Sequence, residues 1–111
     1  MDRLKRGDLV TIAVQGDFGK PRPALVIQND QFAQLGSVVV LPITSTVLDA
    51  PLMRVTVHPD AENGLQKTSQ VMVDKIITVK KEKAKQTFGR MDEDVLLEVD
   101  RCLTVFLGIA N

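Results

Sequence analysis

The chain has 111 residues, of which 44% are hydrophobic and 25% are charged, so we expect a single globular domain over residues 1–111. Its 14 basic and 14 acidic side chains give a net charge of zero, which argues against a general nucleic-acid coat protein. The single cysteine, Cys102, excludes an internal disulfide. The first residues include no apolar run long enough for a signal peptide, and no stretch approaches the ~18 apolar residues of a membrane span, so we expect a cytoplasmic protein.

The first third of the chain is predicted to be mostly β-structure. Residues 9–14 are rich in β-branched side chains and predict a first strand. Residues 15–21 contain two glycines and a proline and predict a loop. The apolar run of residues 23–27 is typical of a strand buried on both faces. Residues 31–35 favour one helical turn, which Gly36 would end.

The centre of the chain holds the most strongly β-like segment, residues 38–41. Pro42 cannot donate a hydrogen bond to a sheet, so we expect it to mark the end of that strand or a sheet edge. Residues 52–57 and 69–74 predict two further strands. Residues 76–79 either continue the last of these strands or begin a partner.

The C-terminal segment changes to a helical pattern. Asp92 is the expected N-cap, Gly108 the expected C-terminal cap, and Cys102 an expected core residue. Strands followed by one long helix predict an α+β or small-barrel fold with the helix packed on one end. The predicted apolar face of the helix comprises Leu96, Val99, Leu103, Phe106 and Leu107.

Charge is segregated along the second half of the chain. Residues 75–90 carry six basic side chains and one acidic one, whereas residues 91–111 carry five acidic side chains and one basic one. This distribution would give one face that attracts phosphate and one that repels it. Two solvated surfaces without a role are the simpler alternative. The six bases are Lys75, Lys80, Lys81, Lys83, Lys85 and Arg90.

Arg22 stands between two prolines, Pro21 and Pro23, at the start of a predicted buried strand. Proline fixes its own φ and pushes the preceding residue toward extended geometry, so the backbone around Arg22 is ordered at reduced entropic cost. A guanidinium held on a rigid strand suits phosphate, because it can bond two oxygens at once. The alternative is a surface arginine on an edge strand.

Thr44 and Ser45 directly follow the predicted central strand. A hydroxyl and nearby backbone N–H groups at a strand end can stabilise a developing oxyanion. Turn residues without chemistry are the alternative reading. Elsewhere, Phe18 lies in a predicted loop and could stack one base, and the lone histidine, His58, is expected at the surface. No set of Cys, His and carboxylate residues has metal-ligand spacing, so no metal or other cofactor is expected.

Taken together, these segments resemble the MazF/PemK family of toxin endoribonucleases in the same order along nearly the whole chain. The Arg-Pro-Ala-Leu-Val and Ile-Thr-Ser segments are the most specific. The matching segments are residues 6–10 (RGDLV), 22–27 (RPALVI), 41–45 (LPITS), 63–65 (NGL) and 74–79 (DKIITV), followed by the C-terminal amphipathic helix.

The resemblance implies an SH3-like β-barrel of the CcdB/PemK type with a long C-terminal helix. It also implies a homodimer that takes single-stranded RNA in a groove, and a cognate antitoxin that neutralises the toxin by occupying that groove. The family cuts RNA without metal, using the 2′-hydroxyl as nucleophile, and leaves a 2′,3′-cyclic phosphate and a 5′-hydroxyl. Such cleavage of mRNA would inhibit translation and growth.

By position, the resemblance implies three catalytic residues: Arg22, Thr44 and Asp74. Arg22 would neutralise charge on the phosphorane and pass a proton to the leaving 5′-oxygen, and Thr44 would donate a hydrogen bond to a non-bridging oxygen. Asp74 matches a carboxylate of the PemK branch. The residues expected to bind RNA are Phe18, Lys20, Ser45, Lys75 and Lys80.

The chain departs from the family pattern at two positions. Many members carry an arginine where this chain has Ile77, and the PemK branch also has one where it has Met72. The general base and the recognised RNA sequence therefore stay open. Two alternatives remain: a CcdB-like poison of DNA gyrase acting through the segment 106–109, and a degenerate member that only binds antitoxin or RNA. A core-facing helix end is the simpler account of residues 106–109.

Overall fold

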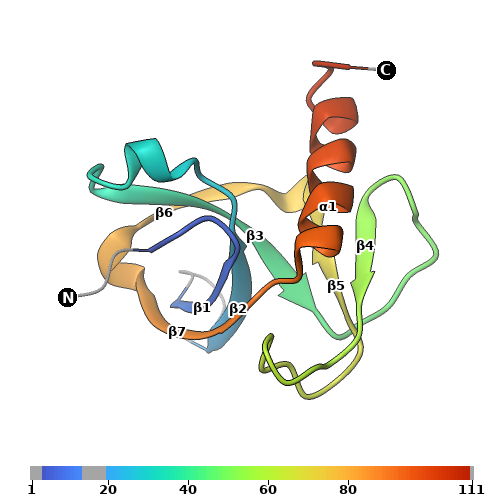
Figure 1. Ribbon diagram of the computed structural model, residues 1–111, viewed down its shortest axis with the longest axis horizontal. Helices are drawn as coiled ribbons and strands as arrows, with labels where there is room; N and C mark the ends of the chain where they lie inside the picture. Colours follow the sequence, from blue (N-terminus) through green and yellow to red (C-terminus); the bar gives the residue numbers. More distant parts are fainter. Residues whose placement is uncertain (1–3, 14–19, 111) are drawn as a thin grey trace.

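The computed structural model describes residues 4–13 and 20–110 (Figure 1). These residues form seven strands, three short 3-10 helices and one α-helix. The strands are β1 (Asp8–Ala13), β2 (Pro21–Val26), β3 (Ser37–Thr44), β4 (Arg54–Val57), β5 (Ser69–Met72), β6 (Ile77–Lys80) and β7 (Ala84–Arg90). The helices are η1 (Asp30–Phe32), η2 (Val73–Lys75), η3 (Lys81–Lys83) and α1 (Glu93–Phe106).

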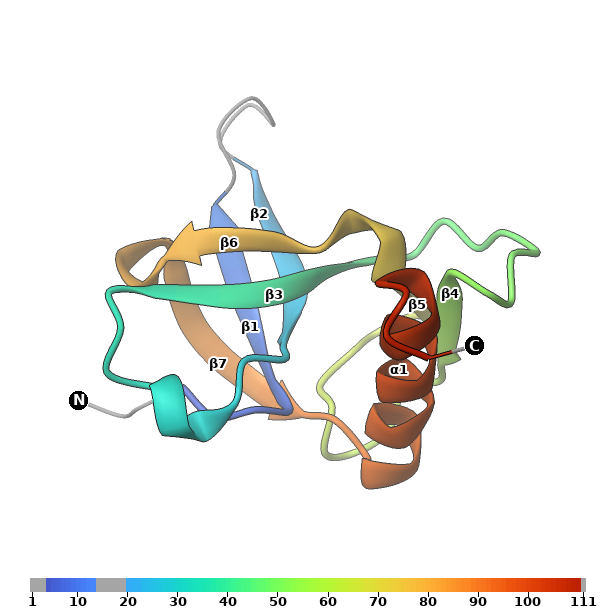
Figure 2. The same ribbon diagram turned by 90° about the horizontal axis from the view of Figure 1, so that it is seen from above.

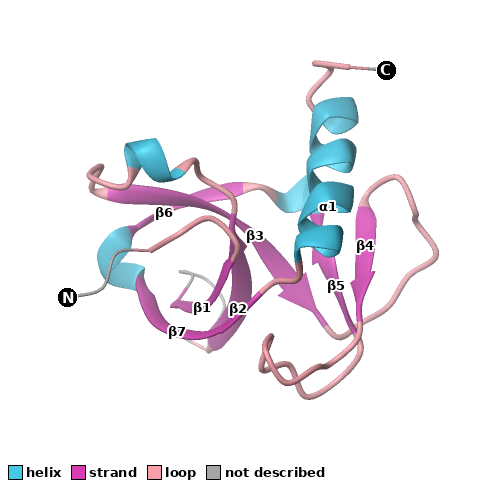
Figure 3. Cartoon of the chain, viewed as in Figure 1, coloured by secondary structure: helices cyan, strands magenta, loops and turns pink. Residues whose placement is uncertain are grey.

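The strands form one antiparallel sheet in the order β4-β5-β3-β2-β1-β7, with β6 also paired to β3. The long strand β3 therefore takes β6 along its first half and β5 at its C-terminal end (Figure 2). Helix α1 stands beside β4 and β5, as Figure 3 shows by element type. The α+β class is thus confirmed, but the barrel is not closed, because β6 and β7 share no ladder within the described chain. No helix in this part of the chain is long and apolar enough to cross a membrane.

The central strands are buried on both faces, as the sequence predicted for residues 23–27. Neighbouring residues of a strand point to opposite faces, so each central strand contributes residues to two hydrophobic clusters, one on each face of the sheet. The first cluster lies on the side of the sheet that α1 covers, and includes Leu9, Leu25, Leu41, Val99 and Leu103. The second lies on the opposite face and comprises Val10, Ile12, Ala24, Val26, Val38 and Val40, with Ile77 packed against it.

Helix α1 begins at the predicted cap, because the Asp92 side chain accepts a hydrogen bond from the backbone N–H of Asp94 at 3.0 Å. It is followed by Gly108 at a φ of 77°, the left-handed conformation that ends many helices. Cys102 is buried, as predicted. Phe106 and Leu107 were expected to face the core, but they are 44% and 51% exposed. The predicted apolar face is therefore one turn too long, since Leu103 is the last helical residue that belongs to the first cluster.

Strand β7 was not predicted. Its side chains are exposed or half-buried, and among the described strands it pairs only with β1, so its sequence carries no alternation of apolar residues. Gly89 is the informative residue of this strand. A Cβ built there would lie 2.2 Å from the carbonyl oxygen of Asn63, which shows how closely β7 approaches the loop after β4.

Pro42 lies inside β3 rather than at its end. In an antiparallel pair, hydrogen-bonded and non-bonded positions alternate, and the N–H of Ile27 donates to the carbonyl of Val39 at 3.2 Å. Pro42, three positions further on, therefore points its nitrogen away from β2. It points toward the edge where the ladder is interrupted between Val40 and Ile43, so its missing N–H breaks no ladder bond.

Candidate active site

Arg22 and Thr44 stand at corresponding positions of adjacent strands. The last pair of the β2–β3 ladder is Ala24 with Pro42, and Arg22 and Thr44 each lie two residues beyond it, at the same end of the two strands. Arg22 is also the cross-strand partner of Ile12 on β1. By the alternation of strand side chains, Arg22 and Thr44 share the face of the second hydrophobic cluster, at the end where that cluster opens to solvent.

A pocket of about 430 Å³ lies at this open end. That volume falls in the range of about 300–1,000 Å³ typical of small-ligand sites. Three of its lining residues are polar or charged, and the others form an apolar wall. The lining comprises Arg22, Thr44 and Lys75 together with Ile12, Pro42, Ile43, Met72 and Ile77.

The flanking prolines place Arg22 at the very start of β2, inside the strand rather than in the preceding loop. Arg22 is exposed, whereas Ala24, two positions further along the strand on the same face, is fully buried. The guanidinium therefore sits where the core ends and solvent begins. There it is anchored by a rigid strand and is still reachable by a substrate.

Thr44 is the last residue of β3 and is half-buried. Its Oγ1 accepts a hydrogen bond from the backbone N–H of Thr46 at 3.1 Å, which fixes the side chain at the strand end. The hydroxyl proton stays available for a ligand, because the hydroxyl group is an acceptor in that bond. Gln70 of β5 pairs with Thr44 on its other side.

Lys75 reaches the pocket because the edge beside β3 carries surplus residues. Between the pairs Ile43–Val71 and Val40–Ile77, β3 advances three residues while its partner advances six. The surplus is taken up by the 3-10 turn η2, which contains Lys75. The sequence predicted a strand through Asp74, and this turn is why β5 stops at Met72.

Asp74 is not among the residues that line the pocket. Its Oδ2 lies 3.3 Å from the Nζ of Lys75, and the two side chains are 21% and 59% exposed respectively. The other oxygen of Asp74, Oδ1, is buried and has no hydrogen-bond partner within the described ranges 4–13 and 20–110. The carboxylate thus contacts the site through Lys75.

Of the other predicted RNA-binding residues, those that the structure describes are not part of the pocket lining. Lys20, Ser45 and Lys80 are all exposed, directly before β2, directly after β3 and at the end of β6 respectively. Phe18 lies outside the described residues. The apolar wall could not be predicted from local sequence pattern, because it depends on long-range register such as the pairing of Ile12 with Arg22.

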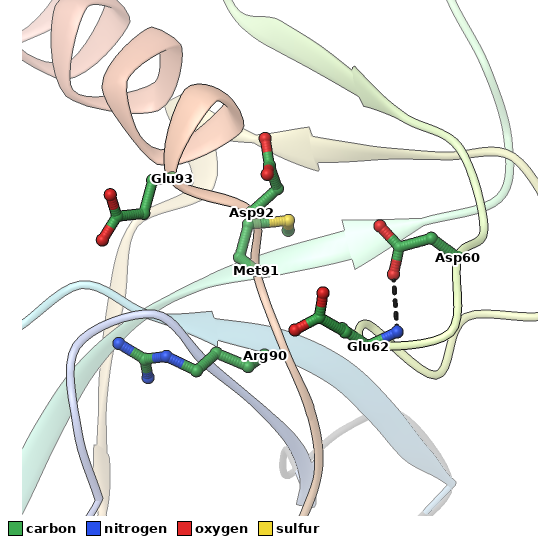
Figure 4. Close-up of a pocket in the computed structure, with 6 residues that line it drawn as sticks. All are labelled: Asp60, Glu62, Arg90, Met91, Asp92 and Glu93. Atoms are coloured by element: carbon green, nitrogen blue, oxygen red, sulfur yellow. Dashed lines mark hydrogen bonds between the residues drawn. The ribbon is translucent and has the colours of Figure 1, made fainter.

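A second, smaller hollow of about 190 Å³ has the opposite charge (Figure 4). Four of its lining residues are acidic, and the backbone N–H of Glu62 donates to Asp60 at 2.8 Å. Clustered carboxylates repel a polyanion, so this hollow is unsuited to RNA. Its lining residues are Asp60, Glu62, Arg90, Met91, Asp92 and Glu93.

Other groups that could carry chemistry lie apart from the pocket. His58 is exposed, and its Nδ1 lies 3.3 Å from the Oγ1 of Thr68. Burial raises the pKa of the Cys102 thiol, and the nearby Glu98 carboxylate adds to the rise while Arg101 opposes it. A thiol with a raised pKa is a poor nucleophile at neutral pH. In the described part of the chain, no group of three or more His, Cys, Asp and Glu residues is arranged to hold a metal ion.

Comparison with known proteins identifies the family. Residues 5–107 match the family of PemK-like, MazF-like toxins of type II toxin-antitoxin systems. A probable endoribonuclease MazF of Mycolicibacterium smegmatis is 44% identical over 109 residues, which cover 97% of this chain and 100% of that protein.

Solved structures share the fold. MazE-MazF from Deinococcus radiodurans has a TM-score of 0.82 at 24% identity, over 99% of this chain and 100% of that one. An endoribonuclease in complex with its cognate antitoxin, from a mycobacterial species, has a TM-score of 0.79 at 22% identity, over 97% and 96% of the two chains. The family match spans nearly the whole sequence, and the chain therefore belongs to the PemK-like, MazF-like toxins of type II toxin-antitoxin systems.

Proposed function

We propose that this protein is the toxin of a toxin-antitoxin system and acts as a metal-independent endoribonuclease on single-stranded RNA in the cytoplasm. The observation that carries the proposal is the placement of Arg22 and Thr44 in one pocket, at the same end of the adjacent strands β2 and β3. The family membership and the M. smegmatis relative, described as a probable endoribonuclease, support the same activity.

The proposed reaction is an internal phosphoryl transfer. The 2′-oxygen of the RNA forms a bond to phosphorus, its proton leaves to solvent, the bond from phosphorus to the 5′-oxygen breaks, and the departing 5′-oxygen takes up a proton. Negative charge grows on the non-bridging oxygens in the transition state, where Arg22 neutralises it and Thr44 donates a hydrogen bond. The products are a 2′,3′-cyclic phosphate and a 5′-hydroxyl.

The pocket suits this substrate in two ways. Its polar side chains, Arg22, Thr44 and Lys75, match a phosphodiester, and its apolar wall of Ile12, Pro42, Ile43, Met72 and Ile77 offers a surface for a base or a ribose. We expect the protein to act as a homodimer and to be neutralised by a cognate antitoxin, as a relative solved with its cognate antitoxin suggests. The whole sequence, residues 1–111, would act as one domain.

The test is cleavage of a long single-stranded RNA by the purified protein, with and without EDTA, beside a single-stranded DNA of the same sequence. We expect equal RNA cleavage in both buffers and no cleavage of DNA, which lacks the 2′-hydroxyl. Cleavage that requires added metal would contradict the mechanism. Intact RNA together with inhibited gyrase supercoiling would favour a CcdB-like poison, and intact RNA with retained RNA binding would favour a degenerate member.

A further inference from the structure

The pocket brings together two cations of different chemistry. Arg22 enters it from β2 and Lys75 from η2, and these are the two basic side chains among the described residues that line it. A guanidinium stays protonated at any pH the protein experiences, whereas an ammonium group can release a proton. The two cations are therefore not interchangeable in a reaction that must protonate a leaving oxygen.

We propose that Lys75 is the general acid of the ribonuclease site and donates a proton to the departing 5′-oxygen; this assignment rests on the proposed function. The bond from the 2′-oxygen to phosphorus forms while the bond from phosphorus to the 5′-oxygen breaks. The 2′-hydroxyl proton goes to solvent, and the Nζ of Lys75 protonates the leaving oxygen and is reprotonated from solvent after the step. Arg22 then acts by charge alone, in place of the proton transfer that the family resemblance implied for it.

The position of Lys75 supports this role. The surplus residues of η2 bring its side chain to the pocket, at 59% exposure, so the ammonium group is accessible to a substrate. The side chains of Met72 and Ile77, which flank η2 and line the same pocket, carry no charge. An apolar wall lowers the local dielectric and strengthens the interaction of Lys75 with an anionic phosphorane.

Asp74 is a positioning residue in this scheme. Its Oδ2 lies 3.3 Å from the Nζ of Lys75, and its other oxygen, Oδ1, is buried. Since Asp74 is not part of the pocket lining, it acts through Lys75 rather than on the substrate. Replacing Asp74 should therefore have no effect once Lys75 has lost its ammonium group.

The experiment compares two RNA substrates that differ at the scissile linkage. One has the natural bridging 5′-oxygen, and the other has sulfur in its place, which leaves without protonation. On the oxygen substrate, Lys75→Met and Lys75→Arg should each lower kcat by roughly 10²–10⁴-fold, the usual contribution of a general acid, with little change in KM. On the sulfur substrate, both variants should cleave within a few-fold of the unmodified protein.

Two controls separate the roles. Lys80→Met removes the same charge from an exposed position of β6 outside the pocket, and should raise KM without lowering kcat. Arg22→Ala should be slow on both substrates, because charge neutralisation is needed with either leaving group. Asp74→Asn should lower kcat on the oxygen substrate alone, and should cause no further loss when combined with Lys75→Met.

The outcomes are distinguishable. Equal losses on both substrates for Lys75→Met would overturn the proton-donor assignment, and so would a Lys75→Met variant with unchanged kcat on both. An additive effect of Asp74→Asn in the Lys75→Met background would overturn the positioning role. Failure of the unmodified protein to cut either RNA would instead overturn the proposed function, and the assignment of Lys75 with it.

Discussion

Arg22 on β2 and Thr44 on β3 each lie two residues beyond Ala24–Pro42, the last pair of the ladder between these strands. Both belong to the face that carries the second hydrophobic cluster, and both line the same pocket where that cluster opens. Both residues belong to strands rather than to loops, so their backbone positions are fixed by the sheet. A phosphate bound between them would meet a guanidinium and a hydroxyl held by the same sheet.

The hydroxyl of Thr44 should matter for catalysis much more than for folding. Thr44→Val keeps the shape of the side chain but removes the donor, so we expect kcat for RNA cleavage to fall by roughly 10²–10³-fold. The lost bond from the N–H of Thr46 should lower stability by only about 1 kcal/mol. Thr46→Val, at an exposed position outside the pocket, is the matched control and should keep full activity.

Gly89 should not tolerate a side chain. A Cβ there would lie 2.2 Å from the carbonyl oxygen of Asn63 and 2.5 Å from its carbonyl carbon. Asn63 cannot yield easily, because it is 1% exposed and its Oδ1 accepts from the N–H groups of Asp60 and Leu65 at 3.1 and 2.9 Å. We expect Gly89→Ala to lower the free energy of unfolding by about 3 kcal/mol in urea denaturation.

The matched control is Gly36, where an added Cβ would meet no atom within 4 Å. Gly36→Ala should leave stability unchanged or raise it by about 0.4–1 kcal/mol, because it restricts the unfolded chain. Similar unfolding curves for the two alanine variants would refute the close approach of β7 to the Asn63 loop.

Arg6 should contribute more to stability than an ordinary surface arginine. Its guanidinium bonds both carboxylate oxygens of Asp100 on α1 and donates through Nε to the carbonyl of Ile27 at 2.9 Å. Loss of these bonds in Arg6→Ala should lower the free energy of unfolding by about 1–2 kcal/mol. Arg101→Ala loses an exposed contact to Glu98 at 3.5 Å and should change stability by under about 0.5 kcal/mol, so equal effects would contradict this role.

The Cys102 thiol should make folding stability depend on alkaline pH. Burial raises the pKa of the thiol in the folded state. In the unfolded chain the thiol has a pKa of about 8.5, so the unfolded chain loses the proton first as pH rises. The contribution to stability is complete below that pH and disappears as pH passes the higher pKa of the folded state. Urea unfolding from about pH 7 to about pH 10 should therefore show a steeper loss for the unmodified protein than for Cys102→Ala. Parallel pH profiles would contradict the raised pKa.

Much of the fold could be predicted from local pattern. The apolar run of residues 23–27 indicated a strand buried on both faces, and the face that includes Val99 and Leu103, with Asp92 as cap, indicated the helix. Both features depend on periodicity and capping, which can be recognised from residues close together in the sequence. The prolines around Arg22 likewise indicated that it would be held on a strand, although they could not tell which residues it would meet.

The remaining features depend on long-range register. Strand β7 lies beside β1 with side chains that are exposed or half-buried, so no apolar alternation in its own sequence marks it as a strand. Pro42 could be accommodated inside β3 only because η2 interrupts the neighbouring ladder, which requires the pairing of residues more than 30 positions apart. The same interruption brings Lys75 to the pocket lining, whereas Asp74 is not part of that lining. Sequence spacing alone therefore could not separate their roles.

The most direct test of the account is the single-turnover cleavage rate of a single-stranded RNA by Arg22→Ala beside the unmodified protein, with the product ends mapped. Arg101→Ala, on the exposed side of α1, controls for loss of a positive charge. We predict 2′,3′-cyclic phosphate and 5′-hydroxyl ends from the unmodified protein and from Arg101→Ala, and a rate at least roughly 10³-fold lower for a correctly folded Arg22→Ala. A folded Arg22→Ala that cuts RNA at the unmodified rate, or 3′-hydroxyl and 5′-phosphate ends, would contradict it.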